Sequence, residues 1–476
     1  MRARKNCSNP VAAAFLIAVS CALTLVPPAG KAGGPLLIGG PAYGIDGHPF
    51  IWDPAAMPIQ YRTDVGPLAS KLDGTVVVAG AAGIARVQAT LQLWQDVPTA
   101  SISFNNAGTI QSTGAFSDGD VSTVEEYDAV YWACIDGTQS PIVFDADGRL
   151  FEDLFGDATV IGMGGPCNLN PTTGYIVSGM VIMNGRWQDG VDSPSYYPVN
   201  YEMTAAEFDM GFAHEFGHFA GLDHSQINVN VLFQEPGACL AADLAGLPLI
   251  FPFYYCQART TAGLPMLAPD DAAWISRLYP ESVNAPPNQT LYASRYGSIR
   301  GAILFSDGTT HVQGVNVVAR DPANPRRIAV SVVAGYLFTG YPGQEVTGDS
   351  PGYALGSRNP LLYGAYEIPV PGGTYTVEVE SVFEAFDGGS SVGPLSPPIP
   401  NPGANEFWDV NESATDSTAV KSNVSVSAGG VVSEINIILN GTLPRYDSFE
   451  SALLWWHHAS PALLREEDLL SLAHSS

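Results

Sequence analysis

The feature that most restricts the fold of this chain is a segment in which histidines and a glutamate follow a helical repeat. The segment is TAAEFDMGFAHEFGHFAGLDHS, residues 204–225. Thr204, followed three residues later by Glu207, forms a capping box, which predicts a helix that starts at Thr204. Gly221 permits the left-handed turn that ends such a helix. Any fold of this chain therefore has to place a helix here and reverse the chain directly after it.

This helix is expected to carry metal ligands on one face. His214 and His218 are four residues apart, so their imidazoles project from consecutive turns. After the turn, the reversed chain can bring His224 to the same point. Three neutral imidazoles leave a fourth tetrahedral position open, which is typical of catalytic rather than structural zinc. Glu215 follows the first ligand and is expected to reach the zinc-bound water, so the segment predicts a zinc site with Glu215 as the catalytic base.

The first 32 residues have the layout of a secretory signal peptide. Three basic residues precede an apolar run from Val11 to Val26, and small residues allow cleavage after Ala32. The run is short for a membrane span and no other stretch reaches that length, so no membrane anchor is expected. Cys21 offers lipidation as a competing interpretation, although the three residues before it are a poor match to a lipoprotein signal. The chain is therefore expected to be secreted or extracellular, or periplasmic or at the cell surface in a bacterium.

The charge balance excludes one class of partner. The chain has 20 basic and 47 acidic residues, a net charge of −27, and loss of residues 1–32 makes it −31 because they hold four basic and no acidic residues. A surface of this sign repels phosphates, so nucleic acid is not an expected partner. With 46% hydrophobic residues, the chain can bury sizeable cores. The expected partner is a protein or peptide substrate.

Four cysteines lie beyond residue 32. An even number of cysteines in an oxidising compartment suggests disulfides. Three pairings are possible, and the sequence does not choose among them. We predict the nearest-neighbour pairing, Cys134 with Cys167 and Cys239 with Cys256. Zinc binding by these thiols is the rival interpretation, but no CxxC spacing supports it.

The segment His214–Ser225 resembles the zinc signature of metzincin peptidases. Its Gly-Leu-x-His-Ser ending, and a later Asp270-Asp271 followed by Leu278-Tyr279, are similar to the matrixin branch. The resemblance spans residues 45–282 and implies an α+β zincin-type (metzincin-like) catalytic domain, with a twisted sheet above the active-site cleft and helices below. It also implies that the strand-like segment Gly174–Trp187 is the edge strand along which an extended substrate pairs.

Two departures from the matrixin pattern matter. Matrixins place a methionine about eight residues after the third histidine, and here that residue is Leu232. We expect Leu232 to form the apolar floor beneath the zinc, with residues 233–265 as an insertion, and Met266 is the alternative floor. Aromatic residues in the insertion suggest an apolar or aromatic side-chain preference. The prosegment cysteine of matrixins is also missing, so latency through a thiolate on zinc is not expected.

The sequence pattern changes after Asn284-Ala285-Pro286-Pro287, which indicates a second domain. Short alternating segments separated by turn signals predict a C-terminal all-β sandwich over 297–442, after a linker at 283–296 and before a tail at 443–476. The strand-like segments are GSIRGAILF, GVNVVAR, RIAVSVVAG, TYTVEVESV and EINIILN. The order of glycine motifs between 297 and 380, ending in Pro371-Gly372-Gly373, resembles carboxypeptidase regulatory-like sandwiches.

A calcium site is a further prediction. Asp145 and Asp147 lie in Asp-Ala-Asp-Gly, followed by Glu152 and Asp153, and this acidic spacing is that of a calcium loop. The same sequence is also a common turn, so the alternative is a turn without a cation.

Two functions are compatible with these patterns. The first is a secreted zinc-dependent endopeptidase that hydrolyses peptide bonds with a metal-activated water and Glu215 as general base. The alternative is a catalytically inert surface adhesion or matrix-binding protein that uses the β-sandwich. The intact glutamate argues against the alternative, because an inert domain has no need of it.

Overall fold

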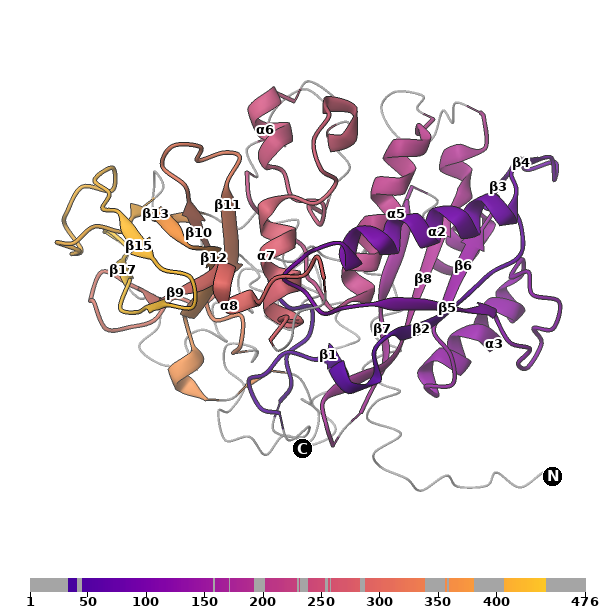
Figure 1. Ribbon diagram of the computed structural model, residues 1–476, viewed down its shortest axis with the longest axis horizontal. Coiled ribbons are helices and arrows are strands. Elements are labelled where there is room, and N and C mark those ends of the chain that lie inside the picture. The colour runs from indigo at the N-terminus through magenta and orange to yellow at the C-terminus, as the bar shows by residue number, and fades with distance from the viewer. Residues whose placement is uncertain are drawn as a thin grey trace, which may run out of the picture.

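The computed structural model describes residues 33–40, 45–156, 159–170, 172–191, 202–228, 231, 239–252, 256, 258–282, 287–338, 356–357, 359–380 and 406–441. The expected signal peptide, the expected tail at 443–476 and Leu232 lie outside these residues. Within the described ranges, no helix combines the length and the apolar character needed to cross a bilayer. The described chain forms a mixed α/β part and a β part (Figure 1).

A six-stranded sheet organises the first part of the chain. Its strands are β1 (Ile51–Trp52), β2 (Ile59–Thr63), β5 (Phe104–Thr109), β6 (Pro141–Asp145), β7 (Gly162–Leu169) and β8 (Tyr175–Asn184). Strands β5, β2, β6 and β8 are neighbours in that order and run parallel. Strand β1 pairs in parallel with the start of β8, and β7 runs antiparallel along β8. A separate hairpin joins β3 (Ala69–Ser70) and β4 (Val76–Val78).

Strand β7, and not the Gly174–Trp187 segment, ends this sheet. The expectation that Gly174–Trp187 is the edge strand was wrong, because its strand β8 pairs with β7 as well as with β6 and β1. The reason lies in its composition. A nearly continuous apolar run is typical of a strand that is buried on both faces, which is a central and not an edge position. All residues of β7, by contrast, are half-exposed.

Helices cover both faces of the sheet. Val181 and Met183 of β8 belong to the same core as α2 (Gly80–Gln95) and α5 (Ala205–Phe219). Met180 and Ile182 belong to a second core with α3 (Val124–Ile135) and α4 (Arg149–Phe155). Successive side chains of a strand point to opposite faces, so the two cores lie on opposite sides of the sheet.

The helix expected to start at Thr204 forms, and α2 packs against it. Helix α2 buries Val87, Leu91 and Trp94, and the Trp94 indole N–H donates to the carbonyl oxygen of Ala213 at 3.0 Å. Helix α5 has Thr204 as its N-cap, and the capping box with Glu207 is present. The bond from Trp94 ties α2 to α5 beside the first expected zinc ligand.

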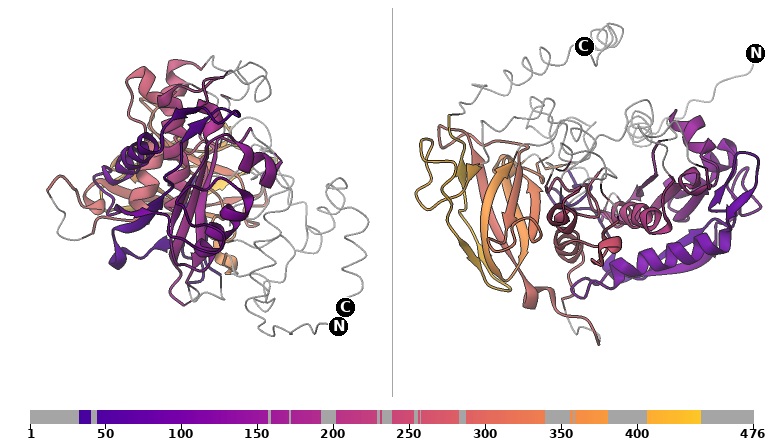
Figure 2. Two further views of the ribbon diagram at one scale, coloured as in Figure 1. Left: turned by 90° about the vertical axis from the view of Figure 1, so that its right-hand side faces the viewer. Right: turned by 90° about the horizontal axis from the view of Figure 1, so that it is seen from above.

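The β part consists of two packed sheets at one end of the molecule (Figure 2). One sheet contains β10 (Asn316–Arg320), β11 (Ala329–Val333), β13 (Gly373–Glu380), β14 (Glu406–Phe407) and β15 (Val424–Val426). The other contains β9 (Tyr296–Leu304), β12 (Ala365–Pro371), β16 (Val431–Val432) and β17 (Ile437–Ile438). Each of the five strand-like segments overlaps one of these strands, although β17 covers only two residues of EINIILN.

Helix α7 (Pro269–Leu278) lies between the two parts (Figures 1 and 2). The Trp274 indole N–H donates to the carbonyl oxygen of Ser331 in β11 at 2.7 Å. The backbone N–H of Ser331 donates in return to Asp270 Oδ1 at 2.8 Å. One continuous hydrophobic core contains Trp274, residues of α5 and residues of both β sheets. Two short helices, α6 (Ala241–Gly246) and α8 (Tyr292–Arg295), flank α7 in the sequence.

The predicted disulfide pairing is present. Cys134 of α3 is joined to Cys167 of β7, and Cys239 is joined to Cys256, with Cα–Cα distances of 5.7 Å in both pairs. The first disulfide links the edge strand to a helix, and the second closes a loop within the expected insertion.

Replacing Cys239 and Cys256 by serine should lower the free energy of unfolding by about 3 kcal/mol. The disulfide closes a loop with a sequence separation of 17 residues, and its loss returns that chain entropy to the unfolded state. Urea titration of the native protein and of the double serine variant measures the difference. Peptide mapping that finds either thiol free, or joined to Cys134 or Cys167, contradicts the pairing.

Candidate metal centre

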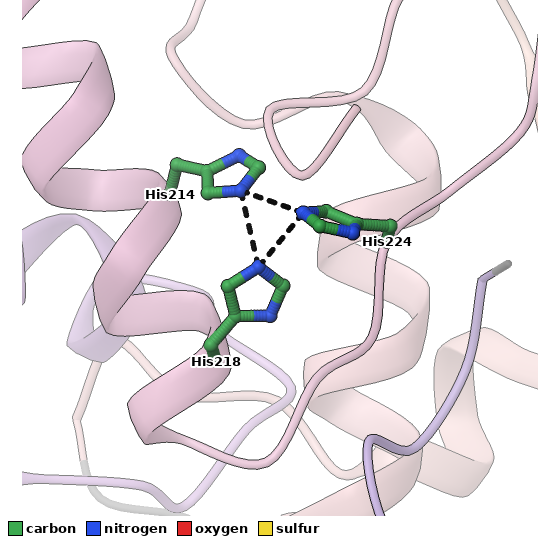
Figure 3. Close-up of side chains that lie close together, drawn as sticks. All are labelled: His214, His218 and His224. Carbon is green, nitrogen blue, oxygen red and sulfur yellow. Dashed lines mark hydrogen bonds between the residues drawn. The ribbon is translucent and has the colours of Figure 1, made fainter. Parts of the chain in front are cut away.

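Three imidazoles meet at one point beside the end of α5 (Figure 3). The Nε2 atoms of His214 and His224 are 3.0 Å apart, those of His218 and His224 are 3.0 Å apart, and those of His218 and His214 are 3.1 Å apart. His214 and His218 project from consecutive turns of α5. Gly221, with φ of 92°, reverses the chain and brings His224 to face them. The structure therefore brings together the three residues that the sequence predicts as zinc ligands.

Hydrogen bonds at the far side of two imidazoles fix their tautomers. His214 Nδ1 lies 3.0 Å from the carbonyl oxygen of Leu249, and His218 Nδ1 lies 2.8 Å from that of Leu222. A carbonyl only accepts, so Nδ1 carries the proton and the neutral ring turns the lone pair of Nε2 toward the centre. Burial lowers the pKa of His214 to about 4 and outweighs the opposing effect of the hydrogen bond with Leu249, so the ring is neutral at neutral pH. Neutral imidazole is the form that binds a metal.

The donor set fits zinc. Nitrogen atoms bound tetrahedrally at about 2.0–2.1 Å from zinc are separated by roughly 3.3–3.4 Å, close to the separations of the three Nε2 atoms. Lone pairs that face one another across 3 Å repel, and a cation between them removes that repulsion. Within the described ranges, these histidines are the one group of at least three His, Cys, Asp or Glu side chains gathered this closely. Three imidazoles and an open fourth position suit Zn²⁺ better than the oxygen-preferring Ca²⁺ or Mg²⁺.

Glu215 of α5 faces the edge strand β7. The residue is 8% exposed, and burial raises the pKa of its carboxyl group to about 8. A nearby divalent cation favours the ionised form and opposes this rise. A Cβ atom placed on Gly162 would come within 2.9 Å of Glu215 Cγ, and one on Gly164 would overlap the carbonyl oxygen of Glu215. The glycines of β7 therefore let its backbone approach the expected catalytic base.

Residues that the sequence analysis did not single out lie against α5 beside the ligands. The carbonyl of Leu249 accepts from His214, and a Cβ on Gly217 would lie 2.8 Å from Ile250 Cγ2. Gly217 lies between His214 and His218, so Ile250 packs against the stretch of α5 that carries both histidines. Of the two expected floor residues, Leu232 lies outside the described residues, and Met266 is a buried core residue. No local signal marks Ile250, because its contact with α5 joins residues 33 positions apart.

Asp271 of α7 fixes the backbone of this segment. Its carboxylate accepts from the backbone N–H of Leu249 at 2.8 Å, of Ile250 at 3.3 Å and of Ala268 at 2.6 Å. Burial raises the pKa of Asp271 to about 6, and these N–H groups oppose the rise. The carboxylate, the backbone of Leu249 and the ring of His214 thus form one hydrogen-bonded series.

The residues of the predicted calcium site have other partners. Asp145 is buried, and its Oδ2 accepts from the backbone N–H of Phe151 at 2.9 Å. Asp147 Oδ2 lies 3.3 Å from Arg149 Nε in an ion pair. In the described part of the chain, no further side-chain ligands join these two carboxylates in a cluster that could hold an ion. The calcium site stays a prediction, and the contacts themselves are those of a turn that starts α4.

No protein-family model matches this chain, and no curated protein and no solved structure was found to match it.

Gly164→Ala should shift α5 away from β7. The added methyl group would overlap the carbonyl oxygen of Glu215, whereas Gly165→Ala meets only Leu36 Cδ2 at 3.8 Å. We expect Gly164→Ala to lower the free energy of unfolding by about 1–3 kcal/mol and to weaken zinc binding, with Gly165→Ala close to the native protein. Urea titration and zinc content after dialysis check both. Equal behaviour of the two variants contradicts the close packing of β7 on Glu215.

Ile250→Ala should weaken zinc binding as well as folding. The substitution removes a fully buried side chain next to Gly217 and should lower the free energy of unfolding by about 2–5 kcal/mol. Ile303→Ala is the matched control, because Ile303 of β9 is equally buried but lies in the β part. Both variants should lose stability, and only Ile250→Ala should raise the dissociation constant for zinc. An unchanged zinc affinity would show that Ile250 does not support the ligands.

Proposed function

We propose that this protein is a secreted zinc-dependent endopeptidase with a zincin-type catalytic domain followed by a β-sandwich. The convergence of the three Nε2 atoms beside the buried Glu215 is the observation that carries this proposal. The parallel sheet with one antiparallel strand at its end, and α5 packed against it, support the catalytic domain. The two packed sheets after residue 295 support the sandwich.

The chemistry divides between the cation and the chain. His214, His218 and His224 would hold a zinc ion, which would supply a water ligand with a pKa of about 7 and polarise a carbonyl group. Glu215 would take the proton from the attacking water and pass it to the leaving amine. The backbone carbonyl of Leu249 orients the His214 ring, and that of Leu222 orients the His218 ring, each by accepting from the Nδ1–H of the histidine. Burial of Glu215 keeps bulk water away from its carboxylate.

Strand β7 offers the surface on which a peptide would align. It is half-exposed throughout, and β8 is its one partner strand among the strands described. An extended peptide can pair with such an edge through its main chain, which orients it without regard to most of its side chains. Because β7 also contacts Glu215 at Gly162, this pairing would place the peptide near the base.

Secretion is part of the proposal. Two disulfides are typical of an oxidising compartment, and the described helices include none fit to span a membrane. The signal-peptide pattern of residues 1–32 supports the same conclusion.

Glu215→Gln should abolish peptidase activity and keep zinc. The amide cannot take a proton from water, so the rate of casein hydrolysis should fall about 10²–10⁴-fold while the ligands remain. Asp209→Asn is the control on the same helix, since Asp209 pairs with Arg86 away from the ligands. A chelator should also stop hydrolysis by the native protein, and zinc should restore it. Casein hydrolysis by Glu215→Gln at the native rate and zinc content would refute the assigned role.

A further inference from the structure

A loop of the β-sandwich binds two segments that are close in sequence to the candidate zinc site. The loop joins β10 to β11 and spans residues 321–328. Its Arg326 pairs with Asp243 of α6, and the carbonyl oxygen of Arg326 accepts from Asn228 Nδ2 at 3.0 Å. Arg320, at the end of β10, donates to Asn228 Oδ1 at 3.0 Å. In Figure 1, α6 lies beside the end of the sandwich that carries β10 and β11.

Both segments connect closely to the candidate zinc ligands. Asn228 follows His224 by four residues, and its φ of 60° puts its backbone in the left-handed region. Helix α6 ends at Gly246, three residues before the Leu249 whose carbonyl accepts from His214. Gly246 packs so closely on the Arg326 carbonyl that a Cβ would overlap it. The same loop therefore fixes the chain after one ligand and the chain that holds another.

Charged groups support the contacts of Arg326 and Arg320 with these two segments. The Asp243 side chain is 1% exposed, so water cannot readily replace its ion pair with Arg326. On the sandwich side, Glu378 and Glu380 of β13 pair with the Arg320 guanidinium. Two carboxylates on one guanidinium fix its orientation, and the group that reaches Asn228 is therefore already positioned by the sheet.

We propose that Arg326 and Arg320 are positioning residues for the zinc site. Through Asp243 and Asn228 they hold the segments that set the places of His214 and His224. The β-sandwich is then part of the metal-binding scaffold and not a separately moving binding module. This inference rests on the proposed zinc-dependent function.

Zinc affinity of the full-length protein tests the inference. Zinc is titrated in competition with a chelator, and the absorption spectrum of the cobalt-substituted protein reports the geometry of the ligands. Arg326→Ala should raise the dissociation constant for zinc about tenfold and change the cobalt bands, as loss of groups that orient ligands does. Arg326→Lys should restore most of the affinity. Arg300→Ala is the matched control, because Arg300 pairs with Glu367 within the sandwich.

A second variant covers the case in which Arg326→Ala does not fold. Asp243→Asn removes the buried charge along with the ion pair and should also raise the zinc dissociation constant. Combining Arg326→Ala with Asp243→Asn should change the zinc affinity no further, because both substitutions remove the same ion pair. Native zinc affinity and cobalt bands in Asp243→Asn, and in any folded Arg326→Ala, overturn the inference but leave the proposed function standing. A native protein that binds no zinc refutes both.

Discussion

The meeting of three imidazole nitrogens at about 3 Å depends on support from distant parts of the chain. The α-helix alone supplies two of the rings. The third requires the reversal at Gly221, and the backbone N–H of Leu36 donates to the Gly221 carbonyl at 2.7 Å. The N–H of Asp223 in turn donates to the carbonyl of Gly34 at 2.8 Å. A short segment near the start of the described chain thus fixes the turn that carries His224.

The helix and the meeting of its two histidines could be predicted because their signals are local. These signals are a capping box, a spacing of four residues between His214 and His218, and a glycine at the turn. Each acts within one or two turns of helix, so it can be recognised without knowledge of the fold. The position of β8 was misjudged because it was taken from the family resemblance, whereas its nearly continuous apolar run is typical of a central strand. Ile250 and Arg326 were missed for a different reason. Their contacts depend on which distant segment packs against them, and the neighbouring residues carry no signal of that.

Buried carboxylates gather where the two parts of the molecule meet. Asp270, Asp271 and Asp243 are all nearly inaccessible to solvent. Burial raises the pKa of Asp270 to about 8, with the neighbouring charge of Asp271 adding to the rise. Asp270 accepts from the backbone N–H of Ser331 in β11, the end strand of its sheet, and Asp271 accepts from that of Leu249, which lies outside the helices and strands. Part of the acid excess of this chain therefore binds backbone N–H groups in the interior and does not cover the surface.

The disulfide between Cys134 and Cys167 has a consequence for the alignment of β7. A strand rich in glycine and open along one side has few side chains to fix its pairing, and a slip by one residue would turn each of them to the other face. The register of β7 on β8 shifts between Pro166 and Asn168, so Cys167 lies at an irregularity of the pairing. A covalent bond from that position to α3 allows only one alignment. Formation of this disulfide therefore favours the native register of β7 on β8.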